Sequence, residues 1–524
     1  MEHSLVRRDF LKFGVVGAAG SALSVGKAAA ASRPGPSRAN FDVTEFGAKG
    51  DGKTIDTPAV NKAIDAAATA GGGTVVFPAG SYLSYSIHLK SNVDLYLGAG
   101  SSIVAADTPS SGGGYDPPEP NQWDHYQDFG HSHWHNSLIW GEGISNISIH
   151  GPGTIWGKGL SRGIPDLPLA PGIGNKSISL KNCHNVTLRD ISILHGGHFA
   201  VLATGVDNLT IDNVLIDTNR DGIDVDCCRN VRISNCSVNS PWDDGICPKS
   251  SYALGYARPT DNVTIANCYV TGIYQEGTLL DGTFKKFAPD AKVPRNGRIK
   301  CGTESNGGFR NLTITNCAIE GCHGIALETV DGGLLEDVTI SNISMRDIVD
   351  VPFFFRLGSR MRGPEGVPVG QLRRVLVNNV VVSNAASRQC ALISGIPDHY
   401  IEDVKFSTIY IQHRGGMTKE DAAISVPEIE NAYPEPGRFG PMPAQGFFIR
   451  HVKNIDMRDI EIKPIQDDAR PAFVLDDVDS ADFTHVRVPR GTSGFLLKNV
   501  KDFDVMQSRP IPNTYLENAP EKSL

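Results

Sequence analysis

The sequence lacks three features that would assign it to a functional class at once. Lysine and arginine number 49 against 58 aspartates and glutamates, giving a net charge of −9, and there is no basic tail or stripe, so nucleic acid is not an expected partner. After residue 32 no apolar run approaches the roughly 18 residues of a membrane span. No pair of CxxC spacings occurs among the ten cysteines, so a structural zinc site is not expected. With 40% hydrophobic residues, the chain can nevertheless build a large core, which excludes a disordered protein.

The cysteines follow a local pattern instead. Three of them follow asparagine in the same local phrase, in Asn235-Cys236, Asn267-Cys268 and Asn316-Cys317. A small, weakly polar side chain at one recurring position indicates a buried column of thiols. Cys227 and Cys228 are adjacent and poorly placed to bridge each other, and one disulfide elsewhere stays open.

Residues 1–32 have the pattern of an export signal. Arg7-Arg8 precedes a short apolar stretch from Phe13 to Val25, which is followed by Lys27 and a run of alanines ending at Ala31. This is the arrangement of a twin-arginine signal peptide. We therefore expect cleavage after Ala30 or Ala31 and a periplasmic or secreted mature protein without a membrane anchor.

A short phrase recurs from residue 146 onward: Asn or Asp, apolar, any residue, apolar. The clearest copies are NISI at 146, NVTLRD at 185, NLTIDN at 208, NVRISN at 230, NVTIAN at 262, NLTITN at 311 and DVTISN at 337, with looser copies at 374, 403 and 454. The steps from 185 to 208 and from 208 to 230 are 23 and 22 residues. A period of this length is typical of a solenoid.

The phrase itself predicts strands, because apolar and polar residues alternate and Val, Ile and Thr are frequent. Three short strands and three turns take roughly 22 to 25 residues, and coils of that size stack at about 4.8 Å with every backbone group paired. The fold class is therefore all-β, a right-handed parallel β-helix. Asparagine tolerates the left-handed backbone at strand ends, which explains its recurrence without a functional role.

The open N-terminal end of the stack is expected to be covered. Thr57 as N-cap, Pro58, and the apolar positions Val60, Ala63, Ile64 and Ala67 predict a short N-terminal capping helix. The segments FVLDDV and GFLLKNV near the C-terminus read as the last coils. We thus expect one β-helix catalytic domain over residues 38–508 and a C-terminal tail over 509–524.

Two neighbouring coils carry aspartates that the fold does not need. Asp221-Gly222-Ile223 and Asp244-Gly245-Ile246 are 23 residues apart, one coil of the period, so their carboxyl groups should stack, with Asp243 beside them. Mutual repulsion in such a cluster raises at least one pKa, which lets a proton donor and a carboxylate coexist. Hydrolysis of a sugar linkage requires that pair. A solvated acidic turn or a calcium site is the alternative interpretation.

These residues also resemble a known family. Asn219-Arg220-Asp221, then Asp243-Asp244 and Lys249, on a β-helix that opens with DVTEFGAKGDG, are similar to glycoside hydrolase family 28, the polygalacturonases and related pectin hydrolases. The resemblance implies an inverting hydrolase of a galacturonate-containing pectic poly- or oligosaccharide. It implies Asp243 as the general acid and Asp221 and Asp244 as the groups that hold the attacking water, with carboxyls about 6.5 to 9.5 Å apart.

The sequence departs from the family beyond Asp244. The family pattern has Gly-His-Gly on the next coil and Arg-Ile-Lys on the one after, and we place those registers at 296–298 and at Ala326-Leu327-Glu328. His323 could replace the missing histidine in tuning a carboxyl. Glu328 in place of a lysine disfavours ordinary polygalacturonan and favours another pectic chain, such as rhamnogalacturonan. The positive charge for a uronate could come from Arg298, Lys300, Arg356 and Arg360, each of which could equally be a surface charge or the partner of an acid such as Glu304.

A long insertion over residues 107–140 is rich in aromatic residues and has histidines at 131, 133 and 135. The three histidines could bind a metal, pack, or line a sugar-contacting wall that narrows the cleft and favours release from a chain end. We expect no metal, no cofactor, and a monomer. A calcium-dependent polysaccharide lyase and a non-catalytic carbohydrate-binding β-helix are the competing interpretations. The linkage that is cleaved and the choice between exo and endo action stay open.

Overall fold

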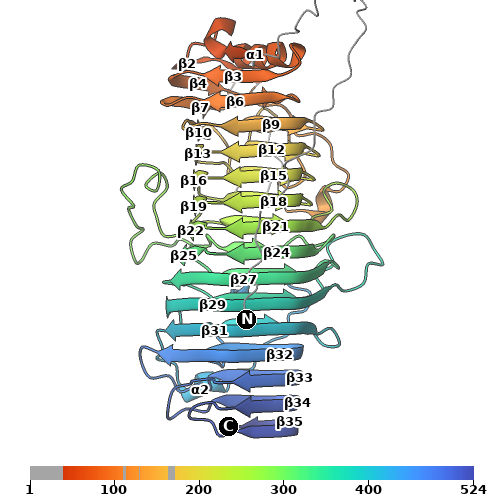
Figure 1. Cartoon of the computed structure of the whole chain (residues 1–524), viewed down its shortest axis with the longest axis vertical. Helices are drawn as coiled ribbons and strands as arrows, with labels where there is room; N and C mark the ends of the chain where they lie inside the picture. The colour runs from red at the N-terminus through yellow and green to blue at the C-terminus, as the bar shows by residue number, and fades with distance from the viewer. Residues whose placement is uncertain (1–38, 110–113, 129, 163–170) are drawn as a thin grey trace, which may run out of the picture. The chain divides into compact units, whose positions relative to one another are not determined.

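The computed structural model describes residues 39–109, 114–128, 130–162 and 171–524. The proposed signal segment lies outside the described residues. Residues 38–524 form one compact unit. Nearly all of its regular structure is β, in one continuous set of 35 paired strands that coil as a right-handed parallel β-helix (Figure 1). In the described part of the chain, no helix has the length and apolar character needed to cross a membrane.

Three ladders of parallel strands form the coils. The first ladder carries the aspartates, and its strands are β5 (Ile87–His88), β8 (Ile139–Glu142), β11 (Lys176–Lys181), β14 (Phe199–Thr204), β17 (Asp221–Asp226), β20 (Ile246–Lys249), β23 (Ile299–Cys301), β26 (Ile325–Thr329), β28 (Phe353–Leu357) and β30 (Ala391–Ser394).

The second ladder contains the repeated phrase. Its strands are β1 (Asn40–Asp42), β3 (Gly73–Phe77), β6 (Val93–Leu97), β9 (Ser145–His150), β12 (His184–Arg189), β15 (Asp207–Asp212), β18 (Arg229–Ser234), β21 (Thr260–Ala266) and β24 (Phe309–Thr315).

The third ladder has β2 (Asp51–Ile55), β4 (Gly80–Ser84), β7 (Ser101–Ala105), β10 (Thr154–Trp156), β13 (Ser192–Leu194), β16 (Leu215–Asp217), β19 (Ser237–Asn239), β22 (Tyr269–Thr271) and β25 (Ala318–Glu320). Toward the C-terminus, longer strands replace the shorter ones, namely β27 (Leu334–Arg346), β29 (Gln371–Ala385), β31 (Ile401–His413), β32 (Phe447–Pro464), β33 (Phe473–Thr484) and β34 (Phe495–Met506).

The asparagines lie where the repeat predicts them. Asn185, Asn208 and Asn230 all have a left-handed backbone, with φ between 55° and 58°. Each donates from its side-chain amide to the side-chain oxygen of the asparagine one coil earlier, at 2.9 to 3.1 Å. The recurrence of asparagine is therefore explained by this ladder of bonds between coils.

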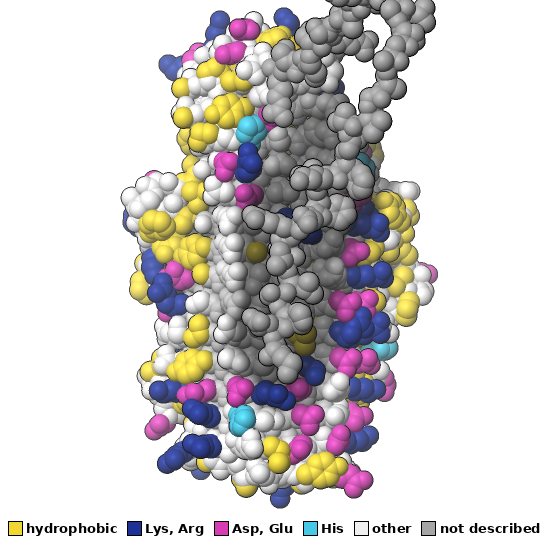
Figure 2. Space-filling model, viewed as in Figure 1, with side chains coloured by type: hydrophobic (Ala, Val, Ile, Leu, Met, Phe, Trp, Pro, Cys, Tyr) yellow, Lys and Arg dark blue, Asp and Glu magenta, His cyan; other side chains and the backbone are white. Residues whose placement is uncertain are grey.

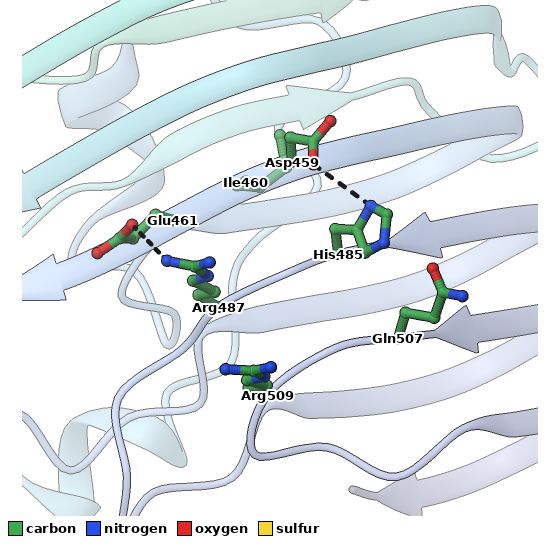
Figure 3. A pocket seen from close by; sticks show the side chains of 7 residues that line it. All are labelled: Asp459, Ile460, Glu461, His485, Arg487, Gln507 and Arg509. Atoms are coloured by element: carbon green, nitrogen blue, oxygen red, sulfur yellow. Dashed lines mark ion pairs between the residues drawn. The ribbon is translucent and has the colours of Figure 1, made fainter.

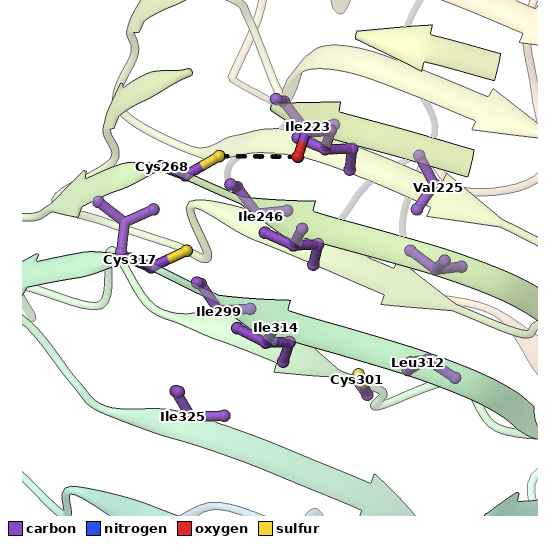
Figure 4. Close-up of a cluster of buried hydrophobic side chains, with 14 of the residues drawn as sticks. Ile223, Val225, Ile246, Cys268, Ile299, Cys301, Leu312, Ile314, Cys317 and Ile325 are labelled. Atoms are coloured by element: carbon purple, nitrogen blue, oxygen red, sulfur yellow. Dashed lines mark hydrogen bonds between the residues drawn. The ribbon is translucent and has the colours of Figure 1, made fainter. Parts of the chain in front are cut away.

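The core is a stack of aligned apolar side chains inside the coils. Ile223, Ile246, Ile299 and Ile325 occupy the same register on successive strands of the first ladder, and Figure 4 shows these isoleucines beside Cys268 and Cys317. All ten cysteines are buried and unbridged in the described chain. Because the inner positions of the first ladder are fixed in this way, the alternating outer positions point away from the core.

Helix α1 (Thr57–Thr69) covers the N-terminal end and buries Val60, Ala63, Ile64 and Ala67 (Figure 1). Its N-cap is Asp56 rather than Thr57. The Asp56 carboxylate accepts from the backbone of Lys49 and Gly50, and the Thr57 hydroxyl accepts from the backbone of Tyr85. Both polar groups thus fasten the helix to the coil beneath it. The second helix, α2 (Lys419–Ala422), is a single turn.

At the C-terminal end, most of the expected tail is regular structure. Residues 514–523 form β35 (Thr514–Ser523), which pairs antiparallel with β34 and covers its outer edge. Figure 2 shows basic and acidic side chains interspersed over the C-terminal coils on the face in view.

Candidate active site

The three aspartates meet at the start of neighbouring strands in the first ladder. Asp221 opens β17 and Asp244 precedes β20, and the backbone amides of Gly222 and Ile223 donate to the carbonyls of Asp244 and Gly245 at 2.9 and 3.0 Å. One carboxyl oxygen each from Asp221, Asp243 and Asp244 lies within 4.8 Å of the other two. The one-coil spacing in the sequence therefore does bring these residues together.

The three carboxyl groups differ in exposure. Asp221 and Asp244 are 3% and 1% exposed, whereas the side chain of Asp243 is 23% exposed. Trp242, the residue before Asp243, is among the exposed large apolar residues. Asp243 thus lies at the mouth of the cluster, where Arg220 donates to its Oδ2 at 2.8 Å.

Their charge environments differ as well. Burial alone would raise the pKa of Asp244, but Lys300 and Arg298 lie 2.6 and 2.7 Å from its two oxygens and hold its pKa well below the usual range. Burial and the nearby carboxylates of Asp224 and Asp243 raise the pKa of Asp221 well above the ordinary value. The cluster therefore pairs an ionised Asp244 with an Asp221 that tends to keep a proton.

The structure places both family registers on the coils assigned from the sequence. Ile299 pairs directly with Ile246, so Arg298-Ile299-Lys300 lies on the coil immediately after Asp244. Residues 272–298 are an excursion within that coil rather than part of a further one. Residues 326–328 lie one coil further on, as expected, because Ile325 pairs with Ile299. An Arg-Ile-Lys tripeptide is thus present one coil earlier than in the family pattern, and its two cations contact Asp244.

Behind Asp221, away from the mouth, lies a second buried cluster. Asp224 is outward-facing on β17 and fully buried, and its Oδ2 lies 3.7 Å from both Lys249 Nζ and His131 Nε2. Lys249 is also 3.5 Å from Glu304. Burial raises the pKa of Asp224 to about 8. Sequence analysis missed Asp224, although its position three residues after Asp221 could have indicated it.

Residues 427–435, which are distant in the sequence, complete the site. The hydroxyl oxygens of Tyr433 and Thr303 are 3.0 Å apart, and Glu435 accepts from Arg298 at 3.0 Å. The segment is anchored by Arg356, which donates to the backbone carbonyls of Glu428 and Ile429 at 2.9 and 3.3 Å. Nothing in the repeat pattern identifies this segment, so the roles of Tyr433 and Glu435 could not be read from the sequence.

The remaining residues singled out from the sequence have other partners. Arg356 holds the segment just described and Arg360 pairs with Asp331, so neither is a free cation for a uronate. His323 lies 3.6 Å from Asp350 and 3.7 Å from Glu435 rather than against the three aspartates, and burial lowers its pKa to about 4.

Asn219 and Glu328 are both buried beside the site. The amide of Asn219 donates to Glu276 at 3.3 Å, and Glu328 accepts from the Thr303 hydroxyl at 3.2 Å. Burial raises the pKa of Glu328 to about 7. Glu328 is therefore close to half protonated at neutral pH, which weakens the repulsion that we expected it to exert on a uronate.

The histidines of the insertion do not converge on one point. His131 faces Asp224, His133 contacts Glu119 and Asp124, and His135 contacts Glu142. Trp134 is fully buried and donates to the Thr204 hydroxyl at 3.0 Å. The insertion therefore packs on the first ladder and contributes one histidine to the site.

A cation between the three aspartates would compete with groups already there. Their oxygens are close enough together to coordinate one, but Lys300 and Arg298 occupy both oxygens of Asp244. Calcium prefers six to eight oxygen ligands, about twice what this cluster offers. The donor set thus fits a calcium-dependent site poorly.

The C-terminal coils carry a separate pocket of about 460 Å³, lined by Asp459, Ile460, Glu461, His485, Arg487, Gln507 and Arg509. Figure 3 shows its ion pairs, Asp459 with His485 at 3.4 Å and Glu461 with Arg487 at 3.9 Å. These side chains are exposed to solvent and their charges are matched. The buried aspartate cluster, with its shifted pKa values, is the better candidate for chemistry.

Comparison with known proteins agrees with this assignment. Residues 40–191 match the family described as rhamnogalacturonase A/epimerase, pectate lyase-like, and residues 124–272, which include all three aspartates, match glycosyl hydrolases family 28. A probable polygalacturonase from Vitis vinifera is 24% identical over 410 residues, 68% of this chain and 77% of the relative.

Two solved structures share the fold. An exopolygalacturonase from Thermotoga maritima superposes with a TM-score of 0.60 at 17% identity, covering 81% of this chain and 92% of that one. A family 28 exopolygalacturonase from Yersinia enterocolitica gives a TM-score of 0.60 at 17% identity, covering 90% and 79%. The similarity to family 28 inferred from the aspartate motifs is confirmed.

Proposed function

We propose that this protein, a glycosidase of the family 28, polygalacturonase-like type, hydrolyses a galacturonate-containing pectic poly- or oligosaccharide with inversion at the anomeric carbon. The observation that carries the proposal is the cluster of three aspartates, with carboxyl oxygens within 4.8 Å and unequal proton affinities. A donor and a water-activating carboxylate are what glycoside hydrolysis needs.

Asp243 is the general acid in this proposal. It is the most exposed of the three aspartates and the one that the oxygen of a leaving sugar reaches first at the mouth. Arg220 lies 2.8 Å from its Oδ2, so an entering saccharide must displace that contact before Asp243 can donate. The cluster titrates as a unit and keeps a proton because of the raised pKa of Asp221. When Asp243 carries that proton, Asp221 is the strongest base left for the water.

Asp221 and Asp244 hold the attacking water. Their nearest oxygens lie within 4.8 Å of each other. Two acceptors at such a distance can share a single water through hydrogen bonds of about 2.8 Å. The cluster thus has room for one activated water. Asp243 also has an oxygen within 4.8 Å of both, closer than the separation of about 6.5 to 9.5 Å between acid and base that is typical of inverting enzymes. A retaining mechanism, with a carboxylate as nucleophile, is therefore the second candidate.

The enclosed side of the site favours release from a chain end. Arg362 Nη1 lies 2.5 Å from Asp128 of the insertion, and the amide of Asn121 donates to the Ala253 carbonyl at 2.9 Å. These contacts hold the insertion beside the coils that carry the cluster, while Asp243 is the most exposed of the three aspartates. In this proposal the insertion forms a wall on one side of the cluster, and such a wall admits a chain terminus more readily than the middle of a chain.

Product analysis on a panel of pectic oligosaccharides tests this function. The parent protein should release reducing ends from at least one pectic substrate, and NMR of the first product should show the anomer opposite to the cleaved linkage. Asp243→Asn should lower the rate about 100- to 10,000-fold, whereas Asp65→Asn on the exposed face of α1 should not change it. Product with retained configuration supports the second candidate, and an unsaturated product whose formation stops on chelation indicates a lyase.

The twin-arginine pattern supports export of the protein to the periplasm or medium, where pectic fragments occur. Fusion of residues 1–37 to a reporter that folds in the cytoplasm tests this. Export should be lost when Arg7 and Arg8 are both replaced by lysine.

A further inference from the structure

A second group of polar side chains, different from the three aspartates, gathers at the start of β26 and β28. His323 comes shortly before β26 and Asp350 shortly before β28, and these two strands pair in parallel. Glu435 reaches them from residues 427–435. One nitrogen or oxygen atom from each of the three residues lies within 4.8 Å of the other two. The fold thus brings one imidazole and two carboxylates together from three separate parts of the chain.

The three side chains do not satisfy one another by hydrogen bonding. Nδ1 of His323 lies 3.6 Å from Oδ2 of Asp350 and 3.7 Å from Oε1 of Glu435, beyond the usual range of about 2.7 to 3.2 Å. Within the described residues, this nitrogen is buried and has no hydrogen-bond partner. A buried polar atom of this kind is costly unless a ligand satisfies it.

Both carboxylates have an oxygen available for a ligand. The side chains of Asp350 and Glu435 are 13% and 29% exposed, so an ion can reach them from solvent. Among the described residues, Asp350 has no side-chain partner besides His323. Glu435 bonds Arg298 mainly through Oε2, at 3.0 Å against 3.5 Å for Oε1. Its Oε1 therefore remains open on the side of His323.

The spacing of these atoms fits a small metal ion. Zinc bonds imidazole nitrogen and carboxylate oxygen at about 2.0 to 2.2 Å, so two ligands of a tetrahedral site lie about 3.4 Å apart. The separations of 3.6 and 3.7 Å close to this value with shifts of a few tenths of an ångström. An imidazole ligand suits zinc and similar transition metals, whereas calcium prefers six to eight oxygens.

Negative charge is in excess around the group. The carboxyl groups that act on one another here outnumber the cations, with Asp244, Glu328, Asp350 and Glu435 against Arg298 and Lys300. One divalent cation would match this excess when all four carboxyl groups are ionised.

We propose that His323, Asp350 and Glu435 bind one zinc-type divalent cation, and that this ion fastens residues 427–435 to the coils of β26 and β28. A water completes the coordination of such a three-ligand site. The ion holds Glu435 in place beside Arg298, which contacts Asp244. No regular spacing in the sequence links the three residues, and the proposal replaces the expectation of no metal.

Titration of Zn²⁺ into the metal-free full-length protein, followed by calorimetry, tests the site. The parent should bind one ion per chain with a Kd of about 1 μM or tighter. His323→Gln and Asp350→Asn should each weaken binding about tenfold or more. His485→Gln is the matched control, because His485 lies beside Asp459 on the exposed C-terminal coils, and it should bind Zn²⁺ as the parent does. Zn²⁺ should also slow hydrogen exchange of the amides of residues 427–435 in the parent but not in His323→Gln.

The outcomes are decided without any turnover, so a failure of the metal site leaves the proposed hydrolysis intact. No binding, a Kd in the millimolar range, or equal affinity in the parent and both variants overturns the proposal. Binding without slower exchange of residues 427–435 overturns the fastening role. If the variants do not fold, Co²⁺ bound to the parent decides: an intense visible absorption band supports a four-coordinate site, and its absence rejects one.

Discussion

The ammonium group of Lys300 lies 2.6 Å from Oδ2 of Asp244, and both side chains are almost fully buried. Because Arg298 contacts the other oxygen, Asp244 is held as a carboxylate in the middle of the cluster. This pairing fixes Asp244 as the ionised aspartate, whereas burial and the nearby carboxylates raise the pKa of Asp221.

Removal of one partner from the Lys300–Asp244 pair should lower the stability of the fold. Lys300→Met leaves a buried carboxylate with one cation fewer, and we expect a loss of about 3–5 kcal/mol in the free energy of unfolding measured with urea. Lys405→Met is the matched control, since the Lys405–Asp456 pair is exposed and should contribute about 0–1 kcal/mol. Equal effects of the two substitutions would contradict the assignment.

The ion pair between Lys300 and Asp244 also predicts how the free energy of unfolding depends on pH. The pKa of Asp244 is depressed in the folded state, so its ionised form stabilises the fold fully above about pH 4, where an unfolded aspartate is ionised. That contribution falls as the pH drops below this value. The parent should therefore lose stability more steeply than Lys300→Met between about pH 4 and pH 2, which unfolding curves at several pH values can measure.

Asp224 should make the stability of the fold change with pH in the opposite direction. Burial raises its pKa to about 8, whereas an unfolded aspartate ionises near about 3.9. Between these values the folded state holds a proton that the unfolded state releases, so stability falls as the pH rises, by at most about 1.4 kcal/mol per pH unit. Asp224→Asn removes this cost, and its stability relative to the parent should increase from pH 5 to pH 7. No such trend is expected for Asp65→Asn, and a flat difference for Asp224→Asn would count against a protonated Asp224.

Arg356 should act through the segment that carries Tyr433 and Glu435. Its two bonds to the carbonyls of Glu428 and Ile429 are lost in Arg356→Met, so amides of residues 427–435 should exchange hydrogen faster in mass spectrometry. We expect kcat/KM to fall about tenfold, because Glu435 then positions Arg298 less firmly. Arg374→Met removes an exposed pair with Asp337 and should leave both measurements unchanged. Unaltered exchange in Arg356→Met would show that other contacts hold the segment.

Much of this architecture follows from local spacing. The repeat of about one coil fixed the strand pattern and the asparagine ladder, and the 23-residue step placed Asp221 beside Asp244. Such inferences succeed because, in a solenoid, each coil contacts only its neighbours.

The parts of the site that the sequence did not predict depend on segments whose length departs from the repeat period. The excursion of residues 272–298 interrupts the spacing, so the repeat gave no indication that Arg298 and Lys300 both contact Asp244. Tyr433 and Glu435 reach the site from a segment more than 100 residues downstream of Thr303 and Arg298. Without a repeat to align them, their approach depends on tertiary packing alone.

Dependence of the rate on the leaving group tests the role of Asp243 most directly. A nitrophenyl leaving group needs little protonation, so Asp243→Asn should be slowed about 100- to 10,000-fold on a natural oligosaccharide but only about tenfold or less on the matching nitrophenyl glycoside. Asp221→Asn, which impairs the water, should slow both substrates alike. If Asp243→Asn is impaired equally on both substrates while Asp221→Asn is rescued by nitrophenol, the assignment of acid and base in this cluster is wrong.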